Sequence, residues 1–143
     1  MIQSPEAGNL WSFWDFEYLT RAKPIEEWRQ KDLSDEARIV FDELLKTNQK
    51  VERFQDWVGF RKYMEGKLKQ ERVWELGFKA DGRQYRILGK FGNQRKQAIL
   101  LIGCYHKMNI YHPVGCLETA YKRSRSLTRG EATIRERKIG TDI

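Results

Sequence analysis

The sequence predicts an α+β sandwich in which helices pack on a twisted sheet. Apolar segments separated by turn residues, from Val73 to Tyr105, are typical of three consecutive strands. Residues 34–46 instead repeat apolar side chains every three or four positions, as an amphipathic helix does. Hydrophobic residues make up 40% of the 143, and five residues are tryptophan, so the chain can bury a modest core as one domain over residues 1–143.

The first half of the chain is predicted to form one strand followed by helices. Residues 10–19, LWSFWDFEYL, are aromatic and partly alternate, which indicates a strand at a sheet edge. Residues 21–32 contain a proline and many charges, and form either a short helix that begins at the proline or a loop. Ser34 is a good N-cap for the helix over 34–46. A further helix is expected over 54–64, although a glycine near its centre weakens the helix propensity.

The second half is predicted to form an antiparallel meander and a final helix. The three strands are expected over residues 73–79, 84–91 and 98–105, with tight turns between them. Pro113 is expected to begin the final helix. The chain after that helix is polar, and residues 133–138 form either a short helix or a mobile tail.

Positive charge is concentrated between Lys79 and Arg125. This stretch holds ten Lys or Arg and two acidic residues, a net charge of +8, whereas the rest of the chain holds 17 basic and 18 acidic residues. A cluster of cations on a sheet predicts a polyanionic partner such as nucleic acid. An anionic membrane surface is the competing interpretation, but the sequence contains no long basic amphipathic helix to support it.

The predicted meander brings chemically active side chains together. The turn at residues 80–82 puts Lys79 near Arg83, and the second hairpin brings the start of the middle strand close to Tyr105-His106-Lys107. The register is uncertain by one or two residues, and a shift of one residue moves a side chain to the other face. The prediction is therefore a neighbourhood of side chains and not a set of exact pairs.

Such a cluster suits cleavage of an RNA phosphodiester by the adjacent ribose 2′-hydroxyl. The reaction needs a base for the hydroxyl proton, donors for the charge on phosphate, and an acid for the leaving 5′-oxygen. Arginine binds phosphate oxygens in pairs, and histidine can take either proton role near neutral pH. Lysine supplies charge, or acts as a base where neighbouring cations lower its pKa, and tyrosine can donate a proton or stack on a base. Each side chain also has a structural alternative, because cations at strand ends are usually solvated surface.

Several other classes of protein find no support in the sequence. No window approaches the roughly 18 consecutive apolar residues of a membrane span, and residues 1–9 lack the pattern of a secretory signal. Cys104 and Cys116 are predicted to be buried, reduced thiols of a cytoplasmic protein. Together with His106 and His112 they do not follow a zinc-ligand spacing, so no metal or cofactor is expected.

The run from Trp74 to Arg125 resembles the RelE/HigB superfamily of toxins from type II toxin–antitoxin systems, and most of all its phage-derived branch. The matching pieces are WELGFKADGRQYRILGKFG, AILLIGCYHKMNIYHP and LETAYKRSR, preceded by DEARIVFDELLK and QDWVGFRKYMEGKL. The resemblance covers a core of about residues 34–125 and leaves a polar C-terminal extension over 128–143 outside it. It implies the RelE-like fold, a curved antiparallel sheet of about four strands with helices packed on it.

The resemblance also implies an activity: a metal-independent endoribonuclease that cleaves mRNA in the ribosomal decoding site. Arg86 matches the core arginine of the family, and Lys79 matches a basic position before the turn. His106 and Lys107 fall where other members place basic or proton-transfer residues, and Tyr111 falls near a tyrosine that some members use. The partners implied are mRNA on the ribosome and a cognate antitoxin, a helix-turn-helix protein.

The predicted site therefore has two parts. The candidate catalytic residues are Lys79, Arg86, His106, Lys107 and Tyr111. The candidate RNA-binding residues are Arg83, Lys90, Arg95, Lys96, Lys122, Arg123 and Arg125.

Two other functions remain open at this point. The related ParE branch shares the fold but inhibits DNA gyrase without catalysis. A gyrase binder has no need of a proton-transfer residue, so the His106-Lys107 pair favours the nuclease. The third possibility is a phage RNA-binding or structural protein that uses its basic face only for affinity.

Overall fold

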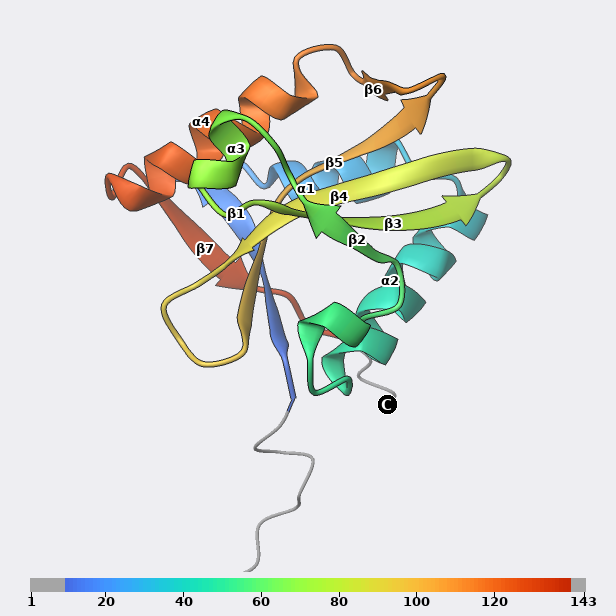
Figure 1. Cartoon of the computed structure of the whole chain (residues 1–143), viewed down its shortest axis with the longest axis horizontal. Helices are drawn as coiled ribbons and strands as arrows, with labels where there is room; N and C mark the ends of the chain where they lie inside the picture. The colour runs from blue at the N-terminus through green and yellow to red at the C-terminus, as the bar shows by residue number, and fades with distance from the viewer. Residues whose placement is uncertain (1–9, 140–143) are drawn as a thin grey trace, which may run out of the picture.

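The computed structural model describes residues 10–139, which form one α+β unit with helices on both faces of a single sheet (Figure 1). Its elements are β1 (Ser12–Tyr18), α1 (Pro24–Lys31), α2 (Asp35–Gln49), the 3₁₀ turn η1 (Phe54–Asp56), β2 (Phe60–Tyr63), α3 (Lys67–Gln70), β3 (Trp74–Ala80), β4 (Arg83–Phe91), β5 (Gln97–Lys107), β6 (Ile110–His112), α4 (Cys116–Thr128) and β7 (Ala132–Glu136). The predicted α+β class is confirmed.

The sheet is larger than the sequence predicts and it is mixed. Across the described residues it has seven strands in the order β2-β3-β4-β5-β1-β7, with β6 paired to β5, where about four antiparallel strands were expected. The parallel pair is β1 and β5, in which Ser12 lies opposite Gln97. One edge of β5 is shared, because β1 pairs with its first residues and β6 pairs with its last residues.

The predicted meander is confirmed as β3, β4 and β5. Its register places Gln84 opposite His106 and Arg86 opposite Cys104. The start of the middle strand therefore lies beside the end of the third, as the sequence indicates.

Each face of the sheet buries its own core. Trp28 of α1 and Phe41 of α2 pack on one face with Ile87 of β4. Ala120 of α4 packs on the other face with Leu101 of β5. Neither α3 nor α4 covers the part of the second face beside β2 and the β5–β6 hairpin, where a cavity lies (Figure 1).

Two of the predicted helices are confirmed with their starts. The Ser34 side chain accepts a hydrogen bond from the backbone N–H of Ala37 at 3.1 Å, which caps α2. Pro24 occupies the first turn of α1, so this segment is a helix and not a loop. The final helix begins at Cys116, three residues after the expected proline.

The helix expected over residues 54–64 is wrong. The chain instead makes the turn η1 and then the edge strand β2, which pairs with β3. Gly59 has a φ of +81°, and a Cβ there would collide with the carbonyl oxygen of Gly77. The Asn48 side chain holds the preceding residue by bonding both the N–H and the C=O of Val58, at 2.7 and 2.9 Å. These contacts come from α2 and β3, so the local pattern did not contain them.

Two predictions about the ends of the sheet are also wrong. The first strand is not an edge strand, because β7 pairs along its outer side. Residues 133–138, expected as a helix or mobile tail, contribute to β7, and Arg135 forms an ion pair with Glu17 of β1 at 2.6 Å. The predictions for residues 1–9 and 140–143 lie outside the described residues.

Candidate functional site

Three of the predicted catalytic residues lie in one row across the sheet. Strand pairing places Lys79 opposite Gln84, Gln84 opposite His106, and His106 opposite Tyr111. Directly paired residues point to the same face, which here is the face that carries α3 and α4. Lys79 stands two strands away from His106, about 10 Å at the usual strand spacing.

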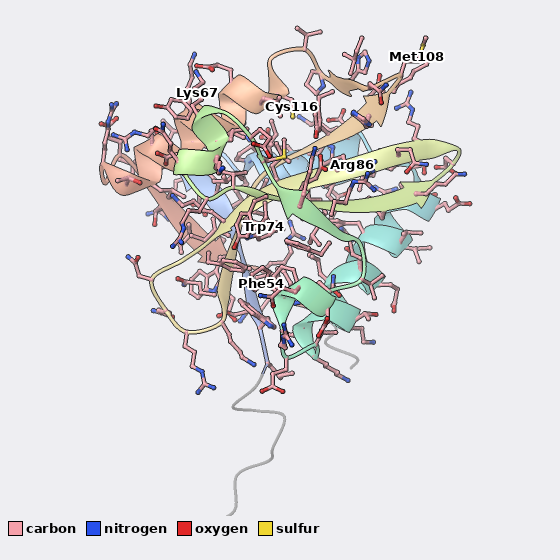
Figure 2. All side chains as sticks on the ribbon, in the orientation of Figure 1. Phe54, Lys67, Trp74, Arg86, Met108 and Cys116 are labelled. Carbon is pink, nitrogen blue, oxygen red and sulfur yellow. The ribbon has the colours of Figure 1, made fainter. Side chains whose placement is uncertain are left out.

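Arg86 lies one row closer to the centre of the same face (Figure 2). Its side chain is buried, and its Nη1 donates to the carbonyl oxygen of Tyr85 at 2.9 Å. Its Nε lies 3.8 Å from Glu75 Oε2. Burial, followed by repulsion from Arg61, lowers the pKa of Arg86, but an arginine pKa starts so high that the guanidinium stays charged.

A buried carboxylate, Glu75, sits at the centre of the cluster with only 2% of its surface exposed. Arg61 Nε lies 3.3 Å from Glu75 Oε1, and the Tyr111 hydroxyl donates to Glu75 Oε2. A buried charge needs such partners, because desolvation without them is costly. Burial and the bond to Glu75 raise the pKa of Tyr111, so its hydroxyl keeps its proton at neutral pH.

Gly77 makes room for the two arginines. A Cβ at this position would lie 2.9 Å from Arg86 Nη1 and 3.0 Å from Arg61 Cδ. The side chains of Arg61 and Arg86 therefore pack on the one residue of β3 that has no side chain.

These side chains surround an open cavity of about 580 Å³. The rings of His106 and Tyr111 lie 4.8 Å apart on one side of it, and β2 forms the other side. The lining residues are Phe60, Arg61, Lys62, Glu75, Arg86, His106, Asn109 and Tyr111. Three cations, one carboxylate and one imidazole thus face a space that an anion can enter from solvent.

Lys107 and Arg83 project from the opposite face of the sheet. Lys107 follows His106 in the strand, and successive residues of a strand point to opposite sides. Arg83 lies opposite Ala80, and its guanidinium covers the ring of Tyr105 at 4.3 Å. The structure therefore does not bring these two cations to the cavity.

Three predicted RNA-binding cations are held by internal partners. Lys90 donates to Ser124 Oγ at 2.8 Å, and Arg125 lies 3.5 Å from Glu71. Arg123 donates to the carbonyl oxygen of Leu101 at 2.8 Å. Leu101 lies in the part of β5 between the residues that pair with β1 and those that pair with β6. These contacts link α4 to the sheet.

The remaining predicted RNA-binding cations lie elsewhere on the surface. Arg95 and Lys96 are in the β4–β5 turn, where Lys96 Nζ lies 5.9 Å from the Trp11 ring. Lys122 is exposed on α4. The basic stretch is therefore spread over several surfaces, and only part of it meets the cavity.

Sequence reasoning missed Glu75 and Arg61. A single acidic residue inside an apolar strand, as Glu75 is in WELGF, is a signal that could have identified it, because such a residue needs a partner. Arg61 had no such signal, because it was assigned to a helix that the structure replaces with β2.

The two cysteines are buried free thiols, as predicted. A hydrogen bond with Cys116, followed by burial, raises the pKa of Cys104, so its thiol stays protonated. Within residues 10–139, no three His, Cys, Asp or Glu side chains gather as they would around a metal ion. In the same part of the chain, no helix has the length and apolar character to cross a bilayer.

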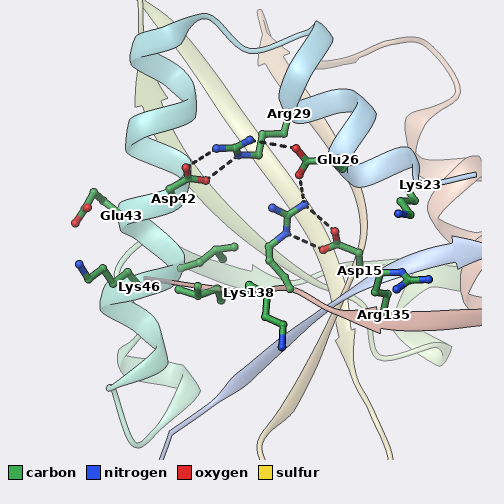
Figure 3. Close-up of a pocket in the computed structure, with 12 residues that line it drawn as sticks. Asp15, Lys23, Glu26, Arg29, Asp42, Glu43, Lys46, Arg135 and Lys138 are labelled. Atoms are coloured by element: carbon green, nitrogen blue, oxygen red, sulfur yellow. Dashed lines mark hydrogen bonds and ion pairs between the residues drawn. The ribbon is translucent and has the colours of Figure 1, made fainter. Parts of the chain in front are cut away.

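A second cavity, of about 550 Å³, lies beside α1, α2 and the chain after β7 (Figure 3). Arg137 donates to Asp15 at 2.9 and 2.7 Å and to Glu26 at 2.9 Å. Arg29 donates to both oxygens of Asp42 at 2.9 and 2.6 Å. These charges satisfy one another, so we assign this cavity a structural role in holding the end of the chain against the helices.

Comparisons with known proteins identify no relative of this chain. No family model matches it, and no curated protein and no solved structure matches it either. The function is therefore inferred from the geometry of the cavity beside β2.

Proposed function

We propose that this chain is a ribosome-dependent mRNA endoribonuclease of the RelE/HigB type, the toxin of a type II toxin–antitoxin pair. In this proposal it acts in the cytoplasm and is neutralised by a helix-turn-helix antitoxin. The observation that carries the proposal is the meeting of Glu75, Arg61, Arg86 and His106 in one open cavity. The combination contains a proton acceptor, two phosphate-binding forks and a proton donor, which are the groups that attack by a ribose 2′-hydroxyl requires.

In the proposed reaction, Arg61 and Arg86 bind the scissile phosphate and offset the charge that builds on its oxygens. The Glu75 carboxylate accepts the 2′-hydroxyl proton. The resulting oxyanion attacks phosphorus, the bond to the 5′-oxygen breaks, and His106 donates a proton to that oxygen. The products are a 2′,3′-cyclic phosphate and a free 5′-hydroxyl.

Tyr111 has a positioning role in this proposal. Its hydroxyl already donates to Glu75, and its raised pKa makes it a weak acid. Lys79 lies in the same row as His106 and can contact the flanking RNA strand, whereas the reaction makes no use of Lys107.

The test is induced expression with mapping of transcript ends. The wild type is expected to stop growth and to cut mRNA within translated codons. Removal of a proton-transfer group should lower cleavage by about 10²–10⁴-fold in Glu75→Gln and His106→Ala, and Arg86→Ala should relieve toxicity as well. Tyr111→Phe should stay within about tenfold of the wild type, because it removes a positioning contact only.

Lys107→Ala is the matched control, because it removes an exposed cation next to His106 from the other face. It should cleave like the wild type, and thermal unfolding should show that every variant is folded. Intact mRNA with relaxed or broken DNA would instead indicate a gyrase inhibitor. Absence of toxicity together with salt-sensitive RNA binding would indicate a non-catalytic RNA-binding protein.

A further inference from the structure

A third cavity, of about 520 Å³, lies at the other end of β2 and has an aromatic wall. We call it the flanking cavity; its aromatic residues are Phe54, Tyr63 and Phe91. The rings of Phe54 and Phe91 lie 4.9 Å apart, and those of Phe54 and Tyr63 lie 6.1 Å apart. Tyr63 is 40% exposed, so part of its ring is free to contact a ligand.

The charged side of the flanking cavity is mostly cationic. Arg72, Lys90 and Arg125 line it together with one carboxylate, Glu71. Lys90 and Arg125 are engaged, because Lys90 donates to Ser124 and Arg125 pairs with Glu71. Arg72 is exposed, and no side chain of residues 10–139 forms a hydrogen bond or ion pair with its guanidinium. It is the cation of this cavity that can bind an added anion.

The flanking cavity and the candidate site share β2. Residues 60–62 line the candidate site, and Tyr63 lines the flanking cavity. Tyr63 is three positions after Phe60 in the strand, about 10 Å at the usual rise. Tyr63 lies opposite Trp74 and therefore points to the other face from Glu75, but β2 is the edge strand of the sheet. An extended RNA strand that passes over this edge can reach both cavities within a few nucleotides.

We propose that the flanking cavity binds a nucleotide of the same single-stranded RNA, next to the linkage that is cleaved. The base stacks on Tyr63, and Arg72 binds a phosphate. An aromatic face beside cations is how proteins hold single strands without reading their sequence. This inference rests on the proposed function, because the ligand is the flank of the same substrate.

The backbone at Arg72 allows a clean test. Its φ is +57°, in the left-handed region where a side chain is disfavoured and glycine is preferred. Arg72→Gly therefore removes the guanidinium and relieves the backbone at once. The melting temperature of this variant should not fall, so a loss of RNA binding would come from the missing cation.

The experiment measures binding of two fluorescent RNAs by anisotropy, one a dinucleotide and one a hexanucleotide, both with 2′-O-methyl sugars that prevent cleavage. For the wild type, the hexanucleotide should bind more tightly than the dinucleotide. Tyr63→Ala should weaken hexanucleotide binding by roughly tenfold, the loss of one stacked base, and leave the dinucleotide unchanged. Arg72→Gly should also weaken it, and should reduce the slope of log K against log salt by about 0.7, the loss of one phosphate contact on a single strand.

Lys31→Ala is the control, because it removes the same charge from α1, which packs on the opposite face from α4. Lys31→Ala should leave the difference in affinity between the hexanucleotide and the dinucleotide unchanged. If the wild type binds both RNAs and the two variants bind the hexanucleotide equally well, the inference is overturned and the proposed function stands. If the wild type binds neither RNA, this inference is overturned, and the mapping of transcript ends decides the proposed function separately.

Discussion

Three side chains of the candidate site are held in place by contacts with one buried carboxylate, Glu75. Glu75 is almost completely removed from solvent, and its charge is tolerated because Arg61, Arg86 and Tyr111 surround it. The ion pairs with Glu75 in turn hold Arg61 and Arg86 at the cavity. A change at any member of this cluster should therefore alter the others, and their effects should not add.

Gly77→Ala should disturb the packing of both arginines at the cavity. The new methyl group would press on Arg86 and Arg61, and Arg61 should move because its side chain is half exposed. The variant should lose roughly tenfold to a hundredfold in cleavage rate, since a displaced phosphate ligand costs about 1.5–3 kcal/mol. Cleavage of a defined mRNA bound to ribosomes, after addition of the purified protein, would measure it.

A double-mutant cycle checks the cause. If Gly77→Ala acts by displacing Arg61, then Gly77→Ala in an Arg61→Ala background should have little further effect. Additive losses would show that the methyl group acts elsewhere.

Among the elements, α1 packs on the sheet through a close approach of Trp28 to β5. Trp28 of α1 is buried and lies directly over Gly103 of β5, where any side chain would overlap the indole ring. The short helix can therefore pack closely on the strand only because Gly103 is a glycine.

Gly103→Ala should destabilise the protein by about 1–3 kcal/mol, because the added carbon overpacks this contact. The free energy of unfolding from urea titration would measure the loss. In a Trp28→Phe background the smaller ring leaves space, so the same substitution should cost less. An equal cost in both backgrounds would rule out the contact with Trp28 as the cause.

At the scale of the whole molecule, the last strand connects the end of the chain to its beginning. β7 pairs along β1, and Arg135 donates to Glu17 at 2.6 and 3.2 Å. Arg137, just beyond β7, bridges Asp15 of β1 and Glu26 of α1 (Figure 3). The residues after the resemblance to the toxin core are thus part of the sheet and its ion-pair network.

This connection predicts acid sensitivity. The hydrogen bond from Arg135 lowers the pKa of Glu17 below its ordinary value, although burial opposes this. A carboxylate with a lowered folded-state pKa stabilises the fold above its unfolded pKa, and the contribution is lost as the pH falls through the folded-state value. The wild type should therefore melt at a higher temperature than Glu17→Gln at neutral pH, and the difference should shrink below about pH 4.

Glu136→Gln is the control, because it removes an exposed carboxylate from the same strand. Melting temperatures from pH 3 to pH 7 would give both comparisons. A difference between the wild type and Glu17→Gln that stays constant across this range would contradict the prediction.

Local pattern alone determined α2 with its serine cap, the β3–β4–β5 meander and the pairing region that brings Arg86 near His106. These features depend on periodicities of about 3.6 and 2 residues and on turns between neighbours in the chain, so a short window of sequence contains them. It also indicated that Cys104 and Cys116 would be buried thiols.

Tertiary structure decided which of the predicted residues share a cavity. The pairs of β1 with β5 and of β2 with β3 join segments that no local pattern connects, and they bring Arg61 to Glu75. The strand alternation also separates His106 from Lys107, because adjacent residues point to opposite faces of the sheet. The register of β5 against β4 decides which of the two side chains points toward the cavity. The cations of the sequence were visible from composition, but their partners depend on long-range packing.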